Sequence, residues 1–82
     1  GLFSRMARVV QSYRSSTSKK IEMQTEGEST ELDKKVLDTL GEPLVHLIRN
    51  AMDHGIEQPS ERLAQGKPEQ GTIRLSAWVT GN

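Results

Sequence analysis

Residues 43–53 constrain the fold of this chain more than any other segment, because their apolar side chains surround most of a predicted helix. The apolar positions are Leu44, Val45, Leu47, Ile48, Ala51 and Met52. A helix that is apolar nearly all round is normally buried at the centre of its domain. We therefore expect the other elements to pack around residues 43–53.

Another helix is predicted directly before this segment. Thr30 and Asp33 match a capping box, in which side-chain oxygens accept hydrogen bonds from the first amides of a helix. The buried stripe of this helix would consist of Leu32, Val36, Leu37 and Leu40. Gly41 is expected to end the helix, and Pro43 to start the next one near its first position, where proline is tolerated.

Two strands and a short helix are predicted around this helical centre. Apolar and polar side chains alternate over residues 20–25 and again over residues 71–79, which is the period of a half-buried strand. The inward-facing positions of the second strand would be Ile73, Leu75 and Ala77. Residues 59–65 predict a short surface helix that begins with a proline.

The N-terminal segment carries a narrow apolar seam, with side chains at steps of three, four and three residues. The seam consists of Phe3, Met6, Val10 and Tyr13. Such spacing is typical of a helix that packs on another helix. Ser and Thr side chains at positions 15–18 compete for backbone hydrogen bonds and end the helix. We therefore predict a helix over residues 2–13 followed by a hinge.

Four polar side chains interrupt the apolar helix on one side. They are His46, Asn50, Asp53 and His54. Spacings of three and four residues place them on neighbouring turns of one helix face. Burying two imidazoles, a carboxamide and a carboxylate costs free energy unless they meet partners, water or a ligand. This polar stripe therefore predicts a cleft with a ligand.

The residue types favour magnesium and phosphate over zinc as that ligand. The two histidines are eight residues apart, about 12 Å along a helix axis, so one zinc ion cannot easily reach both. The Asn50 carbonyl is a hard neutral oxygen, and Mg²⁺ needs only one or two protein ligands beside water and phosphates. Imidazoles above and below it can donate to phosphate oxygens or accept a proton. A zinc-binding helix pair is kept as a minor alternative.

Structural explanations also exist for these side chains. A histidine on an apolar helix is more often a satisfied core residue than a functional one, which applies to His46. His54 precedes Gly55, and the helix dipole favours a cation at a helix C-terminus. Asn50 has no such role, because asparagine is a poor helix former whose amide needs several partners. Asn50 is therefore the strongest candidate for a functional residue.

Length and charge exclude several classes of protein. A chain of 82 residues fits at most one small domain. Residues 1–20 carry five basic and no acidic side chains, and the rest carries six basic and eleven acidic ones, which does not favour binding to nucleic acid. The absence of cysteine excludes a disulfide framework and suits a cytoplasmic location. No apolar run is long enough for direct membrane insertion.

The segment around Asn50 resembles the asparagine box of chemotaxis-type histidine kinases, the CheA family. The matching run is HLIRNAMDHGIE over residues 46–57. Its flanks agree with the family at residues 31–33, 40–44, 66–67 and 71–75. The N-terminal run LFSR, with the seam that follows, resembles the end of the family's dimerisation helix. The resemblance covers essentially the whole chain.

This resemblance implies a fold and a domain order. The expected fold class is α+β, a partial Bergerat-type ATPase with a mixed sheet and helices on one face, preceded by a dimerisation helix. Residues 1–14 would end the dimerisation hairpin, and residues 15–19 would be a hinge. Residues 20–82 would form the N-terminal part of the ATP-binding domain.

The resemblance also implies an activity. The family is a dimeric cytoplasmic kinase that transfers the γ-phosphate of ATP to a histidine on a separate domain and then to response regulators. Asn50 would coordinate Mg²⁺, and His46 would face the γ-phosphate as a base or electrostatic stabiliser. His54 would approach the nucleotide phosphates, with Asp53 in support. Neither histidine would be the phospho-acceptor, which belongs to the separate domain.

Part of the family's nucleotide site has no counterpart in these 82 residues. The glycine boxes that contact adenine and form a lid over the phosphates do not occur in the sequence. We therefore expect the isolated chain to bind Mg-ATP weakly and to be inactive. The alternative hypothesis is a non-catalytic dimerisation or interaction module, in which the seam over residues 2–13 forms a homodimer or binds another helix.

Overall fold

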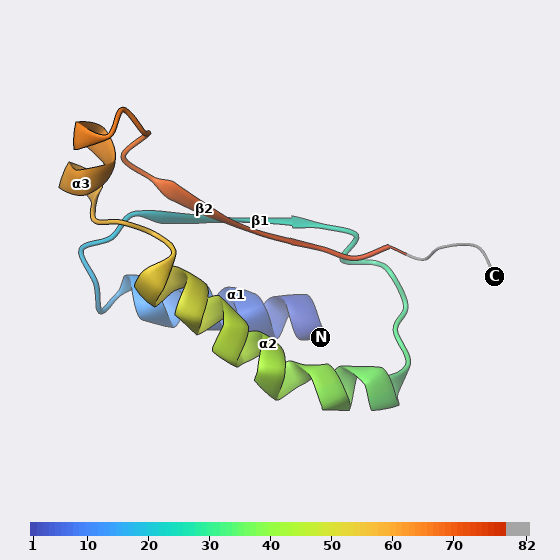
Figure 1. The fold of residues 1–82 in the computed structure, drawn as a ribbon. Helices are drawn as coiled ribbons and strands as arrows, with labels where there is room; N and C mark the ends of the chain where they lie inside the picture. The colour runs from blue at the N-terminus through green and yellow to red at the C-terminus, as the bar shows by residue number, and fades with distance from the viewer. Residues whose placement is uncertain (79–82) are drawn as a thin grey trace.

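The computed structural model describes residues 1–78, in which the two long helices lie below a pair of strands and a short helix lies at one end of that pair (Figure 1). The elements are α1 (Leu2–Arg14), β1 (Ile21–Glu26), α2 (Lys34–His54), α3 (Pro59–Ala64) and β2 (Gly71–Ser76). The two strands pair in parallel, with Ile21 opposite Gly71 and Glu26 opposite Ser76. Because parallel strands need a long crossover, α2 and α3 lie between them in the sequence. The chain is thus a small α+β fragment; the predicted mixed sheet stays a prediction.

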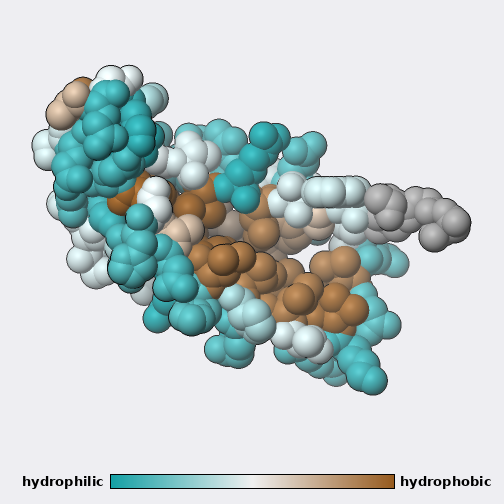
Figure 2. Space-filling view, viewed as in Figure 1, coloured by the Kyte–Doolittle hydropathy of each residue, from teal (hydrophilic) through white to brown (hydrophobic). Residues whose placement is uncertain are grey.

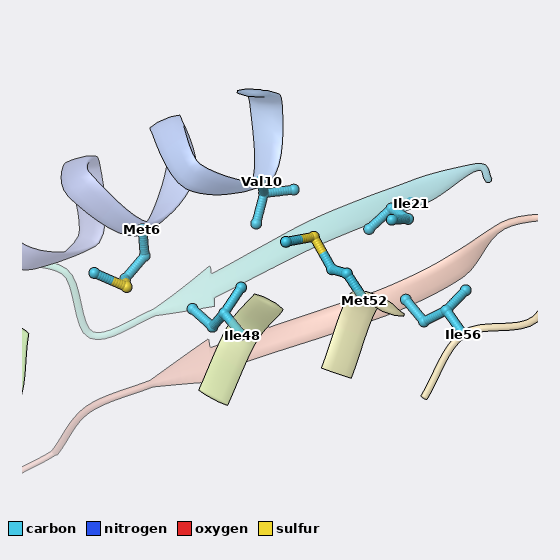
Figure 3. Close-up of a cluster of buried hydrophobic side chains, with 6 residues drawn as sticks. All are labelled: Met6, Val10, Ile21, Ile48, Met52 and Ile56. Atoms are coloured by element: carbon cyan, nitrogen blue, oxygen red, sulfur yellow. The ribbon is translucent and has the colours of Figure 1, made fainter. Parts of the chain in front are cut away.

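The core lies between the helices and the sheet. α1 packs against α2 and β1, and α2 also contacts β2. Six buried side chains from these elements and from the loop after α2 point toward one another (Figure 3): Met6, Val10, Ile21, Ile48, Met52 and Ile56. The prediction that the N-terminal helix packs on another helix is confirmed, and its partner lies in the same chain. Met6 and Val10 of the seam are buried within this chain; a homodimer through the N-terminal helix stays a prediction.

The structure corrects the prediction of two helices that meet at Gly41. α2 continues without a break from Lys34 to His54, with Gly41 and Pro43 inside it. Gly41 is buried against α1, because a Cβ at this position would lie 2.4 Å from Nη1 of Arg5. Pro43 removes one helical hydrogen bond, yet the helix continues into the packed turns around Ile48. Gly41 therefore lies where the Arg5 side chain of α1 rests on α2, and it does not end the helix.

The predicted cap at Thr30 is also wrong. The Asp33 carboxylate accepts a hydrogen bond from the Lys35 amide at 2.7 Å, so Asp33 is the N-cap of α2. Thr30 belongs to the turn after β1, where its hydroxyl lies 3.3 Å from the Ala77 carbonyl. Gly27 in this turn has φ +83°, and a Cβ there would lie 1.9 Å from the Ala77 oxygen. Only glycine fits this approach of the turn to the chain after β2.

α2 is buried on one face and not all round, although its apolar side chains lie on more than one side. Ile48 and Met52 are buried, whereas Leu47 is 63% exposed, and Val36 and Leu40 of the predicted stripe are exposed as well. The reason is that α1 and the sheet cover only one side of the helix in the part of the chain that the structure describes. Hydrophobic side chains consequently gather on the visible face over α2 (Figure 2).

The remaining predicted elements are confirmed with small shifts in their bounds. The first strand covers Ile21–Glu26, and the surface helix covers Pro59–Ala64. The second strand covers Gly71–Ser76, and its pairing extends to Ala77, whose amide donates to the Glu26 carbonyl at 2.9 Å. Val79, the last residue of the predicted strand, lies outside the described residues. No helix in residues 1–78 has the length and apolar character needed to cross a membrane.

Candidate functional site

α2 carries all four predicted site residues on its C-terminal turns. His46, Asn50 and His54 follow one another at four-residue steps, about 6 Å each along the helix axis, and form one line of exposed side chains. Asp53 lies three residues after Asn50 and is directed toward α1. There its Oδ1 accepts a hydrogen bond from the Tyr13 hydroxyl at 2.6 Å. The structure therefore separates Asp53 from the line formed by the other three.

The exposure of these side chains corrects the physical argument for a cleft. His46, Asn50, Asp53 and His54 are all exposed in the part of the chain that the structure describes. A polar side chain in contact with water has no desolvation cost to offset. A ligand is consequently indicated by the residue types and their spacing along α2, and not by burial of these side chains.

The C-terminal end of α2 is held by residues that are distant in the sequence. Lys19 Nζ donates to the carbonyl oxygens of Met52 and Asp53, each at 2.8 Å. A cavity of about 300 Å³ opens here, lined by Lys19, Asp53, His54, Ile56, Glu57, Gln58 and Glu61. A second cavity of about 260 Å³ lies between α1 and α2, lined by Val9, Ser12, Tyr13, Ser16, Arg49 and Asp53. Asp53 therefore lines both of these polar cavities near the end of α2.

Glu57 attaches α3 to the loop that follows α2. Its carboxylate accepts hydrogen bonds from Lys67 Nζ and, at 3.0 Å, from Arg62 Nη1, while Arg62 Nε donates to the Pro68 carbonyl at 2.7 Å. The bond from Lys67, followed by the backbone amide of Glu57 and the two positive charges, lowers the pKa of Glu57 from 4.5 to about 2. Lys67 thus holds the segment that follows His54.

A pH dependence of stability follows from this pKa. Because the folded state lowers the pKa of Glu57, the charged carboxylate stabilises the fold above pH 4.5, and this contribution is lost as pH falls toward 2. We expect the melting temperature of the wild-type chain to fall more steeply over that interval than that of Glu57→Gln. Thermal unfolding followed by circular dichroism at several pH values measures the difference. Parallel curves for the two proteins would contradict the role of Glu57.

The donor set fits magnesium better than zinc. Among residues 1–78, no three His, Cys, Asp or Glu side chains come together in a way that could hold a metal ion. The exposed Asn50 side chain offers one hard oxygen and leaves room for water and phosphate oxygens. The residues present therefore fit a Mg²⁺ ion that is bound together with phosphates, and they do not fit a metal held by the protein alone.

Sequence reasoning missed Tyr13 and Lys19 as part of this site. Tyr13 was predicted as a seam residue, and its contact with Asp53 spans 40 positions in the sequence. Lys19 was placed in the hinge, although it contacts Met52 over 33 positions. Periodicity relates only neighbours within one element. The one available signal was the polar hydroxyl of Tyr13 at the end of an apolar seam, since a tyrosine that packs on a core usually bonds its hydroxyl.

Comparison with known proteins reveals close relatives over almost the whole chain, although no family model matches it. The chemotaxis protein CheA of Rhizobium meliloti is 53% identical over 76 residues, covering 93% of this chain and 10% of that protein. CheA of Bacillus subtilis is 49% identical over 81 residues, covering 99% of this chain and 12% of that protein. The sensor histidine kinase CheAY of Helicobacter pylori is 46% identical over 81 residues, covering 99% of this chain and 10% of that protein.

These matches, together with the exposed line of His46, Asn50 and His54 on α2, define a segment of a sensor histidine kinase. The chain belongs to the CheA family of chemotaxis histidine kinases, as the run over residues 46–57 predicted. It spans about a tenth of the length of the curated relatives that it matches.

Proposed function

We propose that this chain forms part of the Mg-ATP site of a cytoplasmic chemotaxis kinase that transfers the γ-phosphate of ATP to a histidine on a separate domain. The observation that carries the proposal is the exposed line of His46, Asn50 and His54 along α2. This line lies in a segment that is about half identical to CheA proteins.

Each side chain of the line has a distinct role in this proposal. Asn50 holds Mg²⁺ through its carboxamide oxygen, and the bound ion neutralises charge on the phosphates. His46, one turn before Asn50, faces the γ-phosphate as a base or as an electrostatic stabiliser. His54, one turn after it, donates to the nucleotide phosphates. Asp53 supports the site from the side of α1, where the Tyr13 hydroxyl orients its carboxylate.

The proposed partners lie outside the described segment. The phospho-acceptor histidine belongs to a separate domain, which passes the phosphoryl group to response regulators, and the kinase acts as a homodimer. We keep the homodimer contact through the N-terminal helix as part of the proposal; it would use surface of α1 other than Met6 and Val10, which are buried in this chain's own core. The alternative function, an interaction module based on that seam, has less support than the kinase function because two of the four seam residues face this chain's own core.

Nucleotide binding tests the proposal. We expect the full-length kinase that contains this segment to bind Mg-ATP and phosphorylate itself, whereas the isolated chain binds Mg-ATP weakly because it contains no glycine-rich phosphate loop. Calorimetric titration with Mg-ATP and transfer of labelled γ-phosphate are the measurements. Low-micromolar affinity of the isolated chain would show that the segment needs no other part. Absence of phosphohistidine in the full-length protein would contradict the kinase function.

A further inference from the structure

Lys19 closes the C-terminal end of α2. The last carbonyl oxygens of a helix have no partner within the helix. In α2 the Ala51 carbonyl accepts from the Gly55 amide at 2.8 Å, and the next two carbonyls, of Met52 and Asp53, accept from Lys19 Nζ. A cation at this end is also favoured by the helix dipole. One lysine therefore supplies both hydrogen bonds and charge to the turn that carries His54.

The backbone around Lys19 is itself fixed. The Lys19 amide donates to the Thr17 hydroxyl oxygen at 3.2 Å, and the next carbonyl, of Lys20, accepts from the Gly71 amide at 2.8 Å. The second of these bonds joins the segment to the start of β2. The predicted hinge at residues 15–19 is consequently attached to the sheet at one end. The Lys19 side chain connects this segment to α2 through its hydrogen bonds to the Met52 and Asp53 carbonyls.

Tyr13 holds the same turn from the opposite end of the predicted hinge. Its hydroxyl donates to the Asp53 side chain at 2.6 Å, while Lys19 contacts the Asp53 backbone. The bond to Asp53 raises the pKa of Tyr13 from its ordinary value, which favours the protonated hydroxyl that donates to Asp53. Asp53 is thus held at its side chain and its backbone by residues from both ends of the connection between α1 and β1.

We infer that Lys19 and Tyr13 are positioning residues that fix the last turn of α2 for the phosphates of the nucleotide. This inference depends on the proposed function, because it assigns the held turn to the Mg-ATP site. His54 follows Asp53 directly, and Asn50 lies one turn earlier. Without the Lys19 amine the two carbonyls lose their donor, and the turn is free to unwind from its end. The hydrogen bonds of Lys19 to α2 go to backbone oxygens, so its loss weakens nucleotide binding and leaves phosphoryl transfer in the bound complex largely intact.

The test compares substitutions at two adjacent lysines in the full-length kinase. We expect Lys19→Met to raise the KM for Mg-ATP about 10-fold. This is the lower end of the loss of affinity that follows when a group that orients a ligand is removed. The kcat of the variant should stay within about 2-fold of the wild-type value. Lys19→Arg keeps a cation that can donate to both carbonyls and should restore most of the affinity. Lys20→Met is the matched control, because Lys20 makes an exposed ion pair with Glu69 at 2.8 Å and should leave both constants unchanged.

A second variant keeps the test decisive if Lys19→Met unfolds at the assay temperature. Tyr13→Phe removes one hydroxyl, leaves the apolar ring in the seam, and should raise KM about 2- to 3-fold. An unchanged KM in Tyr13→Phe, or in folded Lys19→Met, overturns the inference. An equal effect of Lys20→Met overturns it as well, because the effect would then follow from charge alone. If Asn50→Ala keeps full activity, the proposed function itself fails; if Asn50→Ala is inactive and Lys19→Met keeps its KM, only the positioning role fails.

Discussion

Autophosphorylation of the full-length kinase is expected to fall by at least about 100-fold when Asn50 is replaced by alanine. The substitution removes the only side-chain oxygen that we assign to Mg²⁺, and loss of a group that merely supports a metal ligand already costs about 10–100-fold. The Asn50 side chain is exposed, so its removal leaves the core of α2 unchanged. Transfer of labelled γ-phosphate measures the rate, and sedimentation measures the dimer, which should persist.

Two further variants separate chemistry from folding in this experiment. Asn50→Asp keeps an oxygen at the same place and should retain more activity than Asn50→Ala. Asp38→Ala replaces another exposed side chain of α2, three turns before Asn50, and should have no effect. A normal rate in Asn50→Ala would exclude the proposed magnesium site and would favour a non-catalytic role for the segment.

Replacing Met52 by alanine is expected to destabilise the chain by about 2–5 kcal/mol. Met52 is completely buried at the centre of the cluster that joins α1, α2 and β1. An 82-residue chain has a free energy of unfolding of about 4–12 kcal/mol, so the loss is a large share of the total. Urea unfolding of the chain followed by circular dichroism measures it.

Leu47 provides the matched control on the same helix. Its side chain is of similar size and apolar character but is 63% exposed, so Leu47→Ala should change the stability by less than about 0.5 kcal/mol. The contrast between the two variants tests which face of α2 packs on the sheet. Similar losses for Met52→Ala and Leu47→Ala would mean that α2 is buried on both faces, as its sequence alone suggested.

Local patterns predicted most of the elements correctly. The alternation over residues 20–25 and 71–79 corresponds to β1 and β2, and the seam at residues 2–13 corresponds to α1. These predictions succeed because side-chain spacing reflects the repeat of a single helix or strand. The helical spacing of His46, Asn50 and His54 was predictable for the same reason, since all three lie in α2.

Predictions failed where the partner of a residue lies far away in the sequence. Gly41 has the local character of a helix end, but it is the place where Arg5 of α1 crosses α2. Leu47 is apolar like a core residue, yet its side chain is 63% exposed, because in residues 1–78 α1 and the sheet pack mainly on the other side of α2. In both cases the environment of the residue depends on how α1 and the sheet pack on α2.

The family of this protein and the spacing of its asparagine box were predictable because both are encoded in neighbouring residues. Two features became evident only in the folded chain: α1 packs into the same core as α2, and Tyr13 and Lys19 hold the turn next to His54. The physical reason is that a hydrogen bond across 33 to 40 positions depends on packed elements and leaves no periodic signal in the chain.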